Sequence, residues 1–176
     1  MSLCMAIFYG SSTGNTQLAA EKIKEQMGDW VTHVEDVALA EPAALERFDM
    51  LFFGVSTWNI GEMQDDWDGF IPKMEGLDLT GKKVAFFAMG DAVGYPYNFL
   101  DAMGELWEVV QKLGSPELVG VWPTESYEFE ESRALYDKHH FLGLALDDDN
   151  EAELTDERIK TWLLKVMQEI GLLESV

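Results

Sequence analysis

Four nearly continuous apolar runs recur along the chain, separated by longer segments with a helical pattern. A continuous run, unlike an alternating one, is typical of a strand buried on both faces of a sheet. Strands that alternate with helices predict right-handed crossovers and a parallel sheet covered on both sides. The strand-like runs are LCMAIFY (3–9), MLFFGV (50–55), KVAFFAM (83–89) and ELVGVW (117–122).

The segments between these runs predict the covering helices. TQLAAEKIKEQM follows the first run, NFLDAMGELWEVVQKL follows the third, and LTDERIKTWLLKVMQEI comes near the end of the chain, with Thr155 as its expected N-cap. A shorter helix is expected in EPAALERF, and WVTHVED fits a weaker strand at a sheet edge. The pattern therefore predicts an α/β fold.

One segment breaks this alternation. Residues 123–140 read PTESYEFEESRALYDKHH, which is polar with scattered aromatics, before FLGLAL resumes a strand-like pattern. This indicates an insertion in or after the last strand. With no repeat and no linker visible, residues 1–176 are expected to form a single domain.

The net charge of the chain limits the classes of partner that it is expected to bind. Thirty-three acidic and twelve basic residues give a formal net charge of −21, which disfavours nucleic acid and anionic membranes and favours a basic protein partner. Solubility alone is the alternative explanation of this acidity. Cys4 is the only cysteine, and no transmembrane run or signal peptide is visible, so a cytoplasmic location is expected.

The stretch FYGSSTGNT (8–16) joins the first run to a helical segment through small hydroxylated residues and glycines. Such a loop gathers backbone N–H groups and hydroxyls at the positive end of a helix, where an anion binds. It contains no lysine or arginine and does not match GxxxxGK[ST], so a phosphate monoester fits better than a triphosphate. The alternative is an ordinary strand-to-helix turn capped by serine or threonine.

Two later loops follow the second and third runs, STWNIGEMQDDW and DAVGYPYNF. In an open parallel sheet, loops at the carboxyl ends of the strands converge on one ligand. Each of these loops supplies an aromatic residue, Trp58 and Tyr95, and two facing aromatics can sandwich a flat ring system. A phosphate at one end and a planar ring at the other describe flavin mononucleotide, FMN.

At this point the chain resembles a flavodoxin of the long-chain type over essentially its whole length. The resemblance rests on FYGSSTGNT, STWNIGE, DDW, GDAVGYPYNFLDAMG, VGVWPTESYEFEESRAL and FLGLALDDDNEAELTDERIKTW. It implies a flavodoxin-like three-layer α/β/α sandwich, with a five-stranded parallel sheet in the order 2-1-3-4-5 and FMN at the switch point; this order is the one known for flavodoxins.

The resemblance also implies which residues bind the cofactor. The phosphate loop corresponds to Ser11, Ser12, Thr13, Gly14, Asn15 and Thr16. The residues that flank the two ring faces are Trp58 and Tyr95, and those at its reactive edge are Thr57, Asn59, Ile60 and Gly61. The second ring-binding loop holds or adjoins Gly90, Asp91, Asn98 and Asp101, and Asp147 corresponds to an acidic position near the ribityl chain.

The implied function is a low-potential carrier of single electrons, using the semiquinone/hydroquinone couple, and not an enzyme. A carbonyl at Gly61 could accept a hydrogen bond from the flavin nitrogen that is protonated on one-electron reduction, because glycine lets that peptide rotate. Adding a further negative charge inside a protein of charge −21 is unfavourable, which lowers the potential of the second reduction.

The expected partners are basic redox proteins, such as a flavodoxin/ferredoxin-NADP reductase, and acceptor oxidoreductases. An acidic rim would receive them, and a monomer is the expected state of a carrier that must dock and leave quickly. The rim is formed by Glu62, Asp65, Asp66 and Asp68.

Two other functions compete with the carrier. An FMN-dependent NAD(P)H:quinone oxidoreductase would need room for a nicotinamide, yet both ring faces are expected to be covered. A phosphoacceptor receiver domain would need clustered carboxylates after the first strand, where the chain has FYGSS. No metal site is predicted, because the adjacent His139 and His140 do not share a face and DDDNE (147–151) fits a solvated turn.

Overall fold

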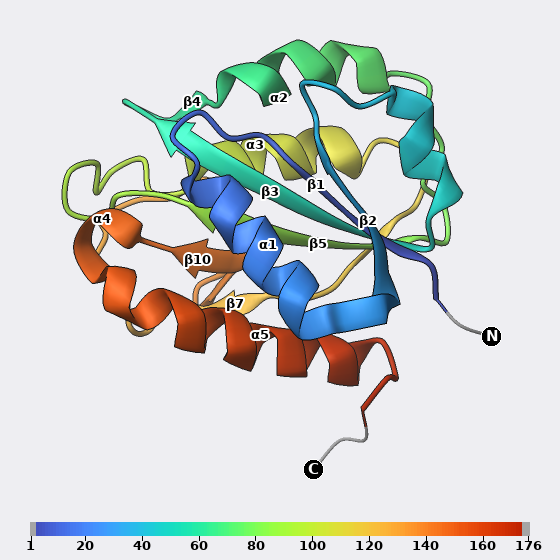
Figure 1. The fold of residues 1–176 in the computed structure, drawn as a ribbon. Helices are drawn as coiled ribbons and strands as arrows, with labels where there is room; N and C mark the ends of the chain where they lie inside the picture. The colour runs from blue at the N-terminus through green and yellow to red at the C-terminus, as the bar shows by residue number, and fades with distance from the viewer. Residues whose placement is uncertain (1–2, 174–176) are drawn as a thin grey trace.

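The computed structural model describes residues 3–173, and its centre is a parallel sheet (Figure 1). Its main strands run in the order β10-β5-β3-β1-β2, which numbers as 2-1-3-4-5 when these five are counted along the chain. The predicted fold is therefore confirmed, including the edge position of the WVTHVED strand. The five strands are β1 (Met5–Tyr9), β2 (Val31–Asp36), β3 (Met50–Trp58), β5 (Lys83–Met89) and β10 (Leu144–Leu146).

Helices cover both faces of this sheet (Figure 1). The helices α1 (Asn15–Met27) and α5 (Thr155–Glu169) pack on one face, and α2 (Asp65–Phe70) and α3 (Asp101–Val110) pack on the other. Successive residues of β1 point to opposite faces, so Ile7 joins the core under α1 and α5, while Phe8 joins the core under α2 and α3. Both faces of the strand are buried, which explains its continuous apolar run.

Short elements complete the connections. The predicted helix in EPAALERF is a 3₁₀ helix, η2 (Pro42–Arg47). The expected N-cap Thr155 is instead the first residue of α5, and its hydroxyl donates to the carboxylate of Asp148. The remaining short helices are η1 (Gly28–Trp30), η3 (Ile71–Met74), α4 (Asp148–Glu151) and η4 (Ala152–Leu154).

The insertion interrupts the last strand. A short strand β6 (Glu117–Leu118) pairs with the beginning of β5, and β10 pairs with its end. Between them the chain forms a separate antiparallel sheet of β7 (Trp122–Pro123), β9 (His140–Phe141) and β8 (Leu135–Asp137). The excursion from the edge of the main sheet thus begins shortly before the predicted residues 123–140 and ends shortly after them.

Tyr127 anchors this insertion to the main sheet. Its hydroxyl donates to the carbonyl of Ala145 in β10 and accepts from the indole N–H of Trp122 at 2.8 Å. The guanidinium of Arg158 lies 4.3 Å from the centre of the tyrosine ring, within the range of a cation–π contact. Burial raises the pKa of the Tyr127 hydroxyl to about 12. A buried, neutral hydroxyl can both donate and accept, which this position requires.

Candidate cofactor site

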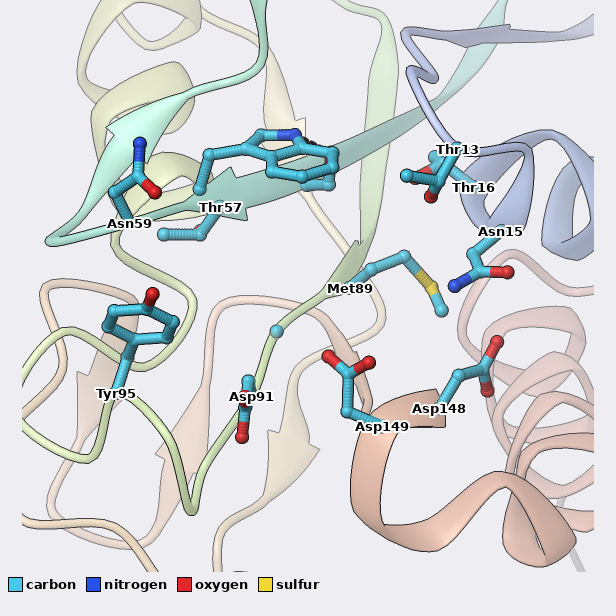
Figure 2. A pocket seen from close by; sticks show the side chains of 13 residues that line it. Thr13, Asn15, Thr16, Thr57, Asn59, Met89, Asp91, Tyr95, Asp148 and Asp149 are labelled. Atoms are coloured by element: carbon cyan, nitrogen blue, oxygen red, sulfur yellow. Dashed lines mark hydrogen bonds between the residues drawn. The ribbon is translucent and has the colours of Figure 1, made fainter.

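A cleft of about 340 Å³ opens at the carboxyl ends of β1, β3 and β5 (Figure 2). This is the edge at which open parallel sheets bind ligands. Four segments contribute to its walls: the loop and helix start after β1, the end of β3, the loop after β5, and α4. The lining residues are Thr13, Asn15, Thr16, Ser56, Thr57, Trp58, Asn59, Met89, Gly90, Asp91, Tyr95, Asp148 and Asp149.

The loop after β1 is shaped to receive an anion. Gly14 precedes α1 with φ of 95°, a left-handed conformation that glycine adopts without strain, and its N–H donates to the hydroxyl of Ser11 at 3.0 Å. Because Gly14 has no side chain, the first turn of α1 receives no side-chain cap. Asn15 and Thr16 of that turn line the cleft, so the open donors and the positive helix end face it (Figure 2). These neutral donors fit a phosphate.

The hairpin between β3 and β4 (Glu62–Met63) forms the wall on one side. Trp58 pairs with Glu62 across the hairpin, and Asn59 and Gly61 in its turn have φ of 47° and 84°. The indole N–H of Trp58 donates to the hydroxyl of Ser56 at 3.0 Å, which fixes the ring against the end of its own strand. Ile60 at the tip is 75% exposed, so it borders the cleft without lining it.

The loop after β5 forms the facing wall and is organised by Asp91. The carboxylate of Asp91 accepts the backbone N–H groups of Val93 and Gly94 at 3.2 and 2.7 Å, and its carbonyl accepts that of Tyr95 at 3.0 Å. These bonds fold the loop back so that Tyr95, a residue that is 42% exposed, lines the cleft (Figure 2). Trp58 and Tyr95 therefore supply aromatic surface from two different loops, as a planar ligand requires.

Several predicted residues support the walls instead of lining the cleft. The buried carboxylate of Asp101 accepts from the backbone N–H of Arg133 at 2.8 Å and from the amide of Asn98 at 3.2 Å. Asp147, also buried, accepts the backbone N–H of Ala92 at 3.1 Å and so ties the loop after β5 to the start of α4. The predicted residues outside the lining are Ser11, Ser12, Gly14, Ile60, Gly61, Asn98, Asp101 and Asp147.

The structure also adds lining residues that the sequence did not suggest. Ser56 and Met89 are neighbours in the register of β3 and β5, and the Met89 side chain points into the cleft (Figure 2). Each lies immediately before a predicted site residue, so its position in the sequence could have indicated a lining role. Both belong to apolar strands, however, where a core role is the more obvious prediction. Asp148 and Asp149 come from the DDDNE segment. The predicted solvated turn is wrong there, because Asp147 is buried and Asp148–Glu151 form α4, which packs against the cleft.

This segment makes one end of the cleft strongly acidic. Carboxylate oxygens of Asp91, Asp147 and Asp149 lie within 4.8 Å of one another, and the amide of Asn150 donates to both Asp91 and Asp147 at 2.8 and 2.9 Å. Burial, followed by the charges of Asp91 and its acidic neighbours, raises the pKa of the Asp149 carboxyl. Negative charge is therefore already costly at this end of the cleft.

A doubly wound sheet of this order, with an anion loop after β1 and aromatic loops after β3 and β5, defines the flavodoxin class of α/β proteins. The family model described as Flavodoxin matches residues 7–162. The chain therefore belongs to the flavodoxin family, and the resemblance noted in the sequence is confirmed.

Individual relatives agree with this assignment over nearly the full chain. The flavodoxin of Synechococcus elongatus is 45% identical over 96% of this chain and 98% of its own length. Flavodoxin 1 of Escherichia coli is 44% identical over 94% of each chain. Among solved structures, Fusobacterium nucleatum flavodoxin bound to flavin mononucleotide superposes with a TM-score of 0.87, at 27% identity, over 95% of this chain and 98% of that one.

Within residues 3–173, every helix is too short or too polar to span a bilayer.

Proposed function

We propose that the cleft binds FMN and that the protein carries single electrons at low potential between redox proteins, without being an enzyme itself. The observation that carries this proposal is the presence, in one cleft, of an anion-binding loop and two aromatic walls. Membership of the flavodoxin family supports it, as does the bound flavin mononucleotide named for the Fusobacterium nucleatum flavodoxin.

The residues of this chain divide the work of binding between two ends. Loop residues 11–16 would hold the phosphate through backbone N–H groups and hydroxyls, without a basic side chain. Trp58 and Tyr95 would flank the ring, and the hairpin turn at Asn59, Ile60 and Gly61 would meet its edge. FMN itself supplies the redox chemistry, because a flavin accepts one or two electrons. The proposed site comprises all seventeen residues predicted from the sequence, whether they line the cleft or support its walls.

The negative charge of the protein determines the direction in which the reduction potential of bound FMN is shifted. Asp91, Asp148 and Asp149 line the cleft within a chain of formal charge −21. Adding an electron there brings negative charge toward existing negative charge, which is unfavourable and lowers the reduction potential. Replacing these carboxylates by amides is expected to raise it.

A basic redox protein is the proposed partner, for example a flavodoxin/ferredoxin-NADP reductase, with an acceptor oxidoreductase on the other side of the transfer. Glu62 in β4 and Asp65 and Asp68 in α2 are exposed at or next to the hairpin between β3 and β4, where they would steer such a partner toward the cleft. Charge reversal of this rim is expected to slow electron transfer and flatten its dependence on salt while FMN stays bound. Unchanged kinetics would count against the docking role. A monomeric, single-domain carrier in the cytoplasm completes the proposal.

Absorbance during stepwise anaerobic reduction tests the function directly. One FMN released per chain by acid, together with a persistent one-electron-reduced form that absorbs at long wavelength, supports the carrier. Reduction in a single two-electron step, with rapid oxidation of NADPH by the protein alone, would favour the FMN-dependent NAD(P)H:quinone oxidoreductase. A protein that does not bind added FMN would contradict both.

A further inference from the structure

Gln64 links the start of α2 to the loop after β1. It follows β4 directly, is 1% exposed, and is the N-cap residue of α2. Its side-chain oxygen accepts the backbone N–H groups of Asp66 and Trp67 at 3.1 and 3.2 Å. These bonds cap the first turn of α2, and they also fix which way the amide faces, because only its oxygen can accept from two N–H groups.

Capping alone does not explain a glutamine here. Serine, asparagine and aspartate are the residue types that cap helices best, and each is shorter. The extra length carries the amide nitrogen to the loop after β1, where it donates to the hydroxyl of Ser12 at 3.0 Å. The second amide proton goes to the carboxylate of Asp66 at 2.9 Å. Both the nitrogen and the oxygen of this buried amide are therefore fully used in hydrogen bonds.

The loop is pressed closely against this amide. A Cβ added to Gly10 would lie 2.2 Å from the side-chain oxygen of Gln64 and 2.7 Å from the indole of Trp67. The N–H of Gly10 also donates to the carbonyl of Gly54 at 3.1 Å, so the start of the loop is fixed to β3. Two residues further along the loop, the hydrogen bond from the Gln64 amide holds the exposed Ser12.

We propose that Gln64 is a positioning residue for the phosphate-binding loop, acting through the hydroxyl of Ser12. This inference rests on the proposed binding of FMN. Ser12 does not line the cleft, whereas the neighbouring Thr13 and Thr16 do, so the tether holds the loop from its outer side. With this hydrogen bond between Gln64 and Ser12, the tether, in place, the loop keeps its donors turned toward the cleft before any ligand binds. Without it, binding must also order the loop.

Two substitutions separate this tether from the helix cap. Gln64→Ser keeps a capping hydroxyl at the N-cap but is too short to reach Ser12, whereas Ser12→Ala keeps the cap and removes the acceptor. Each is expected to weaken FMN binding by about three- to tenfold, the equivalent of one hydrogen bond. Riboflavin, which has the same ring but no phosphate, should bind each variant within about twofold of its affinity for the unaltered protein.

The double variant tests whether the two residues act through one contact. Because either substitution already breaks the tether, Gln64→Ser with Ser12→Ala should weaken FMN binding no more than either change alone. Fluorescence quenching of the flavins on titration with apoprotein gives all of these affinities, and urea unfolding checks that each variant folds.

The outcomes are distinct. Unchanged FMN affinity in both single variants, or an equal loss of FMN and riboflavin, would overturn the role of Gln64 while leaving FMN binding by the unaltered protein intact. If Gln64→Ser fails to fold, Gln64→Asn replaces it, because asparagine keeps an amide oxygen for the cap and is one methylene shorter than the side chain that reaches Ser12. Ser12→Ala alone does not decide, since the same hydroxyl belongs to the proposed phosphate loop. An unaltered protein that binds neither flavin would instead refute the proposed function.

Discussion

Gly61, in the turn of the hairpin between β3 and β4, is a residue at which a single added methyl group should measurably destabilise the protein. Its φ of 84° lies in the left-handed region, which costs an alanine about 1–2 kcal/mol. The added Cβ would also lie 2.8 Å from a carboxylate oxygen of Asp101. That carboxylate is buried and holds both Asn98 and the backbone of Arg133, so its displacement disturbs two hydrogen bonds. Gly61→Ala is therefore expected to lower the free energy of unfolding of the apoprotein by about 2–4 kcal/mol.

Urea unfolding followed by tryptophan fluorescence measures this loss, and Gly69→Ala provides a matched control. Gly69 lies in α2, is exposed, and a Cβ added there meets nothing within 4 Å. Because alanine is the better helix former, this control should gain up to about 1 kcal/mol. The two glycine-to-alanine changes should thus have opposite signs. A Gly61→Ala protein as stable as the unaltered one would refute the argument from backbone strain and the Asp101 contact.

Three further substitutions test other parts of the structure. Tyr127→Phe removes the hydroxyl that anchors the insertion and should cost about 1–3 kcal/mol in urea unfolding, because the buried carbonyl of Ala145 and the indole N–H of half-buried Trp122 both lose their partner; an unshifted midpoint would contradict the anchor. Asp149→Asn should stabilise the apoprotein at pH 7, since burial and nearby carboxylates raise the pKa of this carboxyl and make its ionised form unfavourable in the folded state. That gain should shrink as the pH falls through the raised pKa and disappear below the ordinary value of 3.8, where the carboxyl is protonated in both states. A pH-independent gain would show that charge is not its cause. Tyr95→Ala should weaken FMN and riboflavin alike, by about threefold or more, since it removes ring stacking and leaves the phosphate loop intact; a loss confined to FMN would argue against stacking.

The apolar pattern predicted the sheet well wherever one strand was one uninterrupted run. It was misleading at ELVGVW, which it assigned to one strand. Only Glu117 and Leu118 pair with β5 there, and Trp122 joins the antiparallel sheet of the insertion. Gly120, with φ of 79°, turns the chain between them. Hydropathy does not separate the two sheets, because Val119, Val121 and Trp122 continue the apolar run on both sides of this turn.

The prediction of the site was best for loops and weakest for contacts between distant segments. The sequence pointed to the loops that contribute Thr13, Trp58 and Tyr95, since polar and glycine-rich stretches after strands have few other uses. Asp149 was missed because it reaches the cleft only through the packing of α4 against the loop after β5. Gln64 was missed for a similar reason, because a helix cap gives no local sign that its nitrogen contacts another loop.

The interruption of the edge strand leaves the pairing of the main sheet unchanged. Leu118 and Leu144 pair with residues of β5 that have two positions between them, and the edge chain supplies Val119 and Gly143 opposite that gap. A chain joined directly from Val119 to Gly143 would therefore continue along β5 in the same register, with each side chain on the face it occupies now. Evolution could therefore gain or lose residues 120–142 here as a unit without realigning any strand of the main sheet. Because the N–H groups of Glu130 and Glu131 donate to the carbonyl of Pro96, next to Tyr95, such a change would reach the cleft through the loop after β5 and not through the sheet.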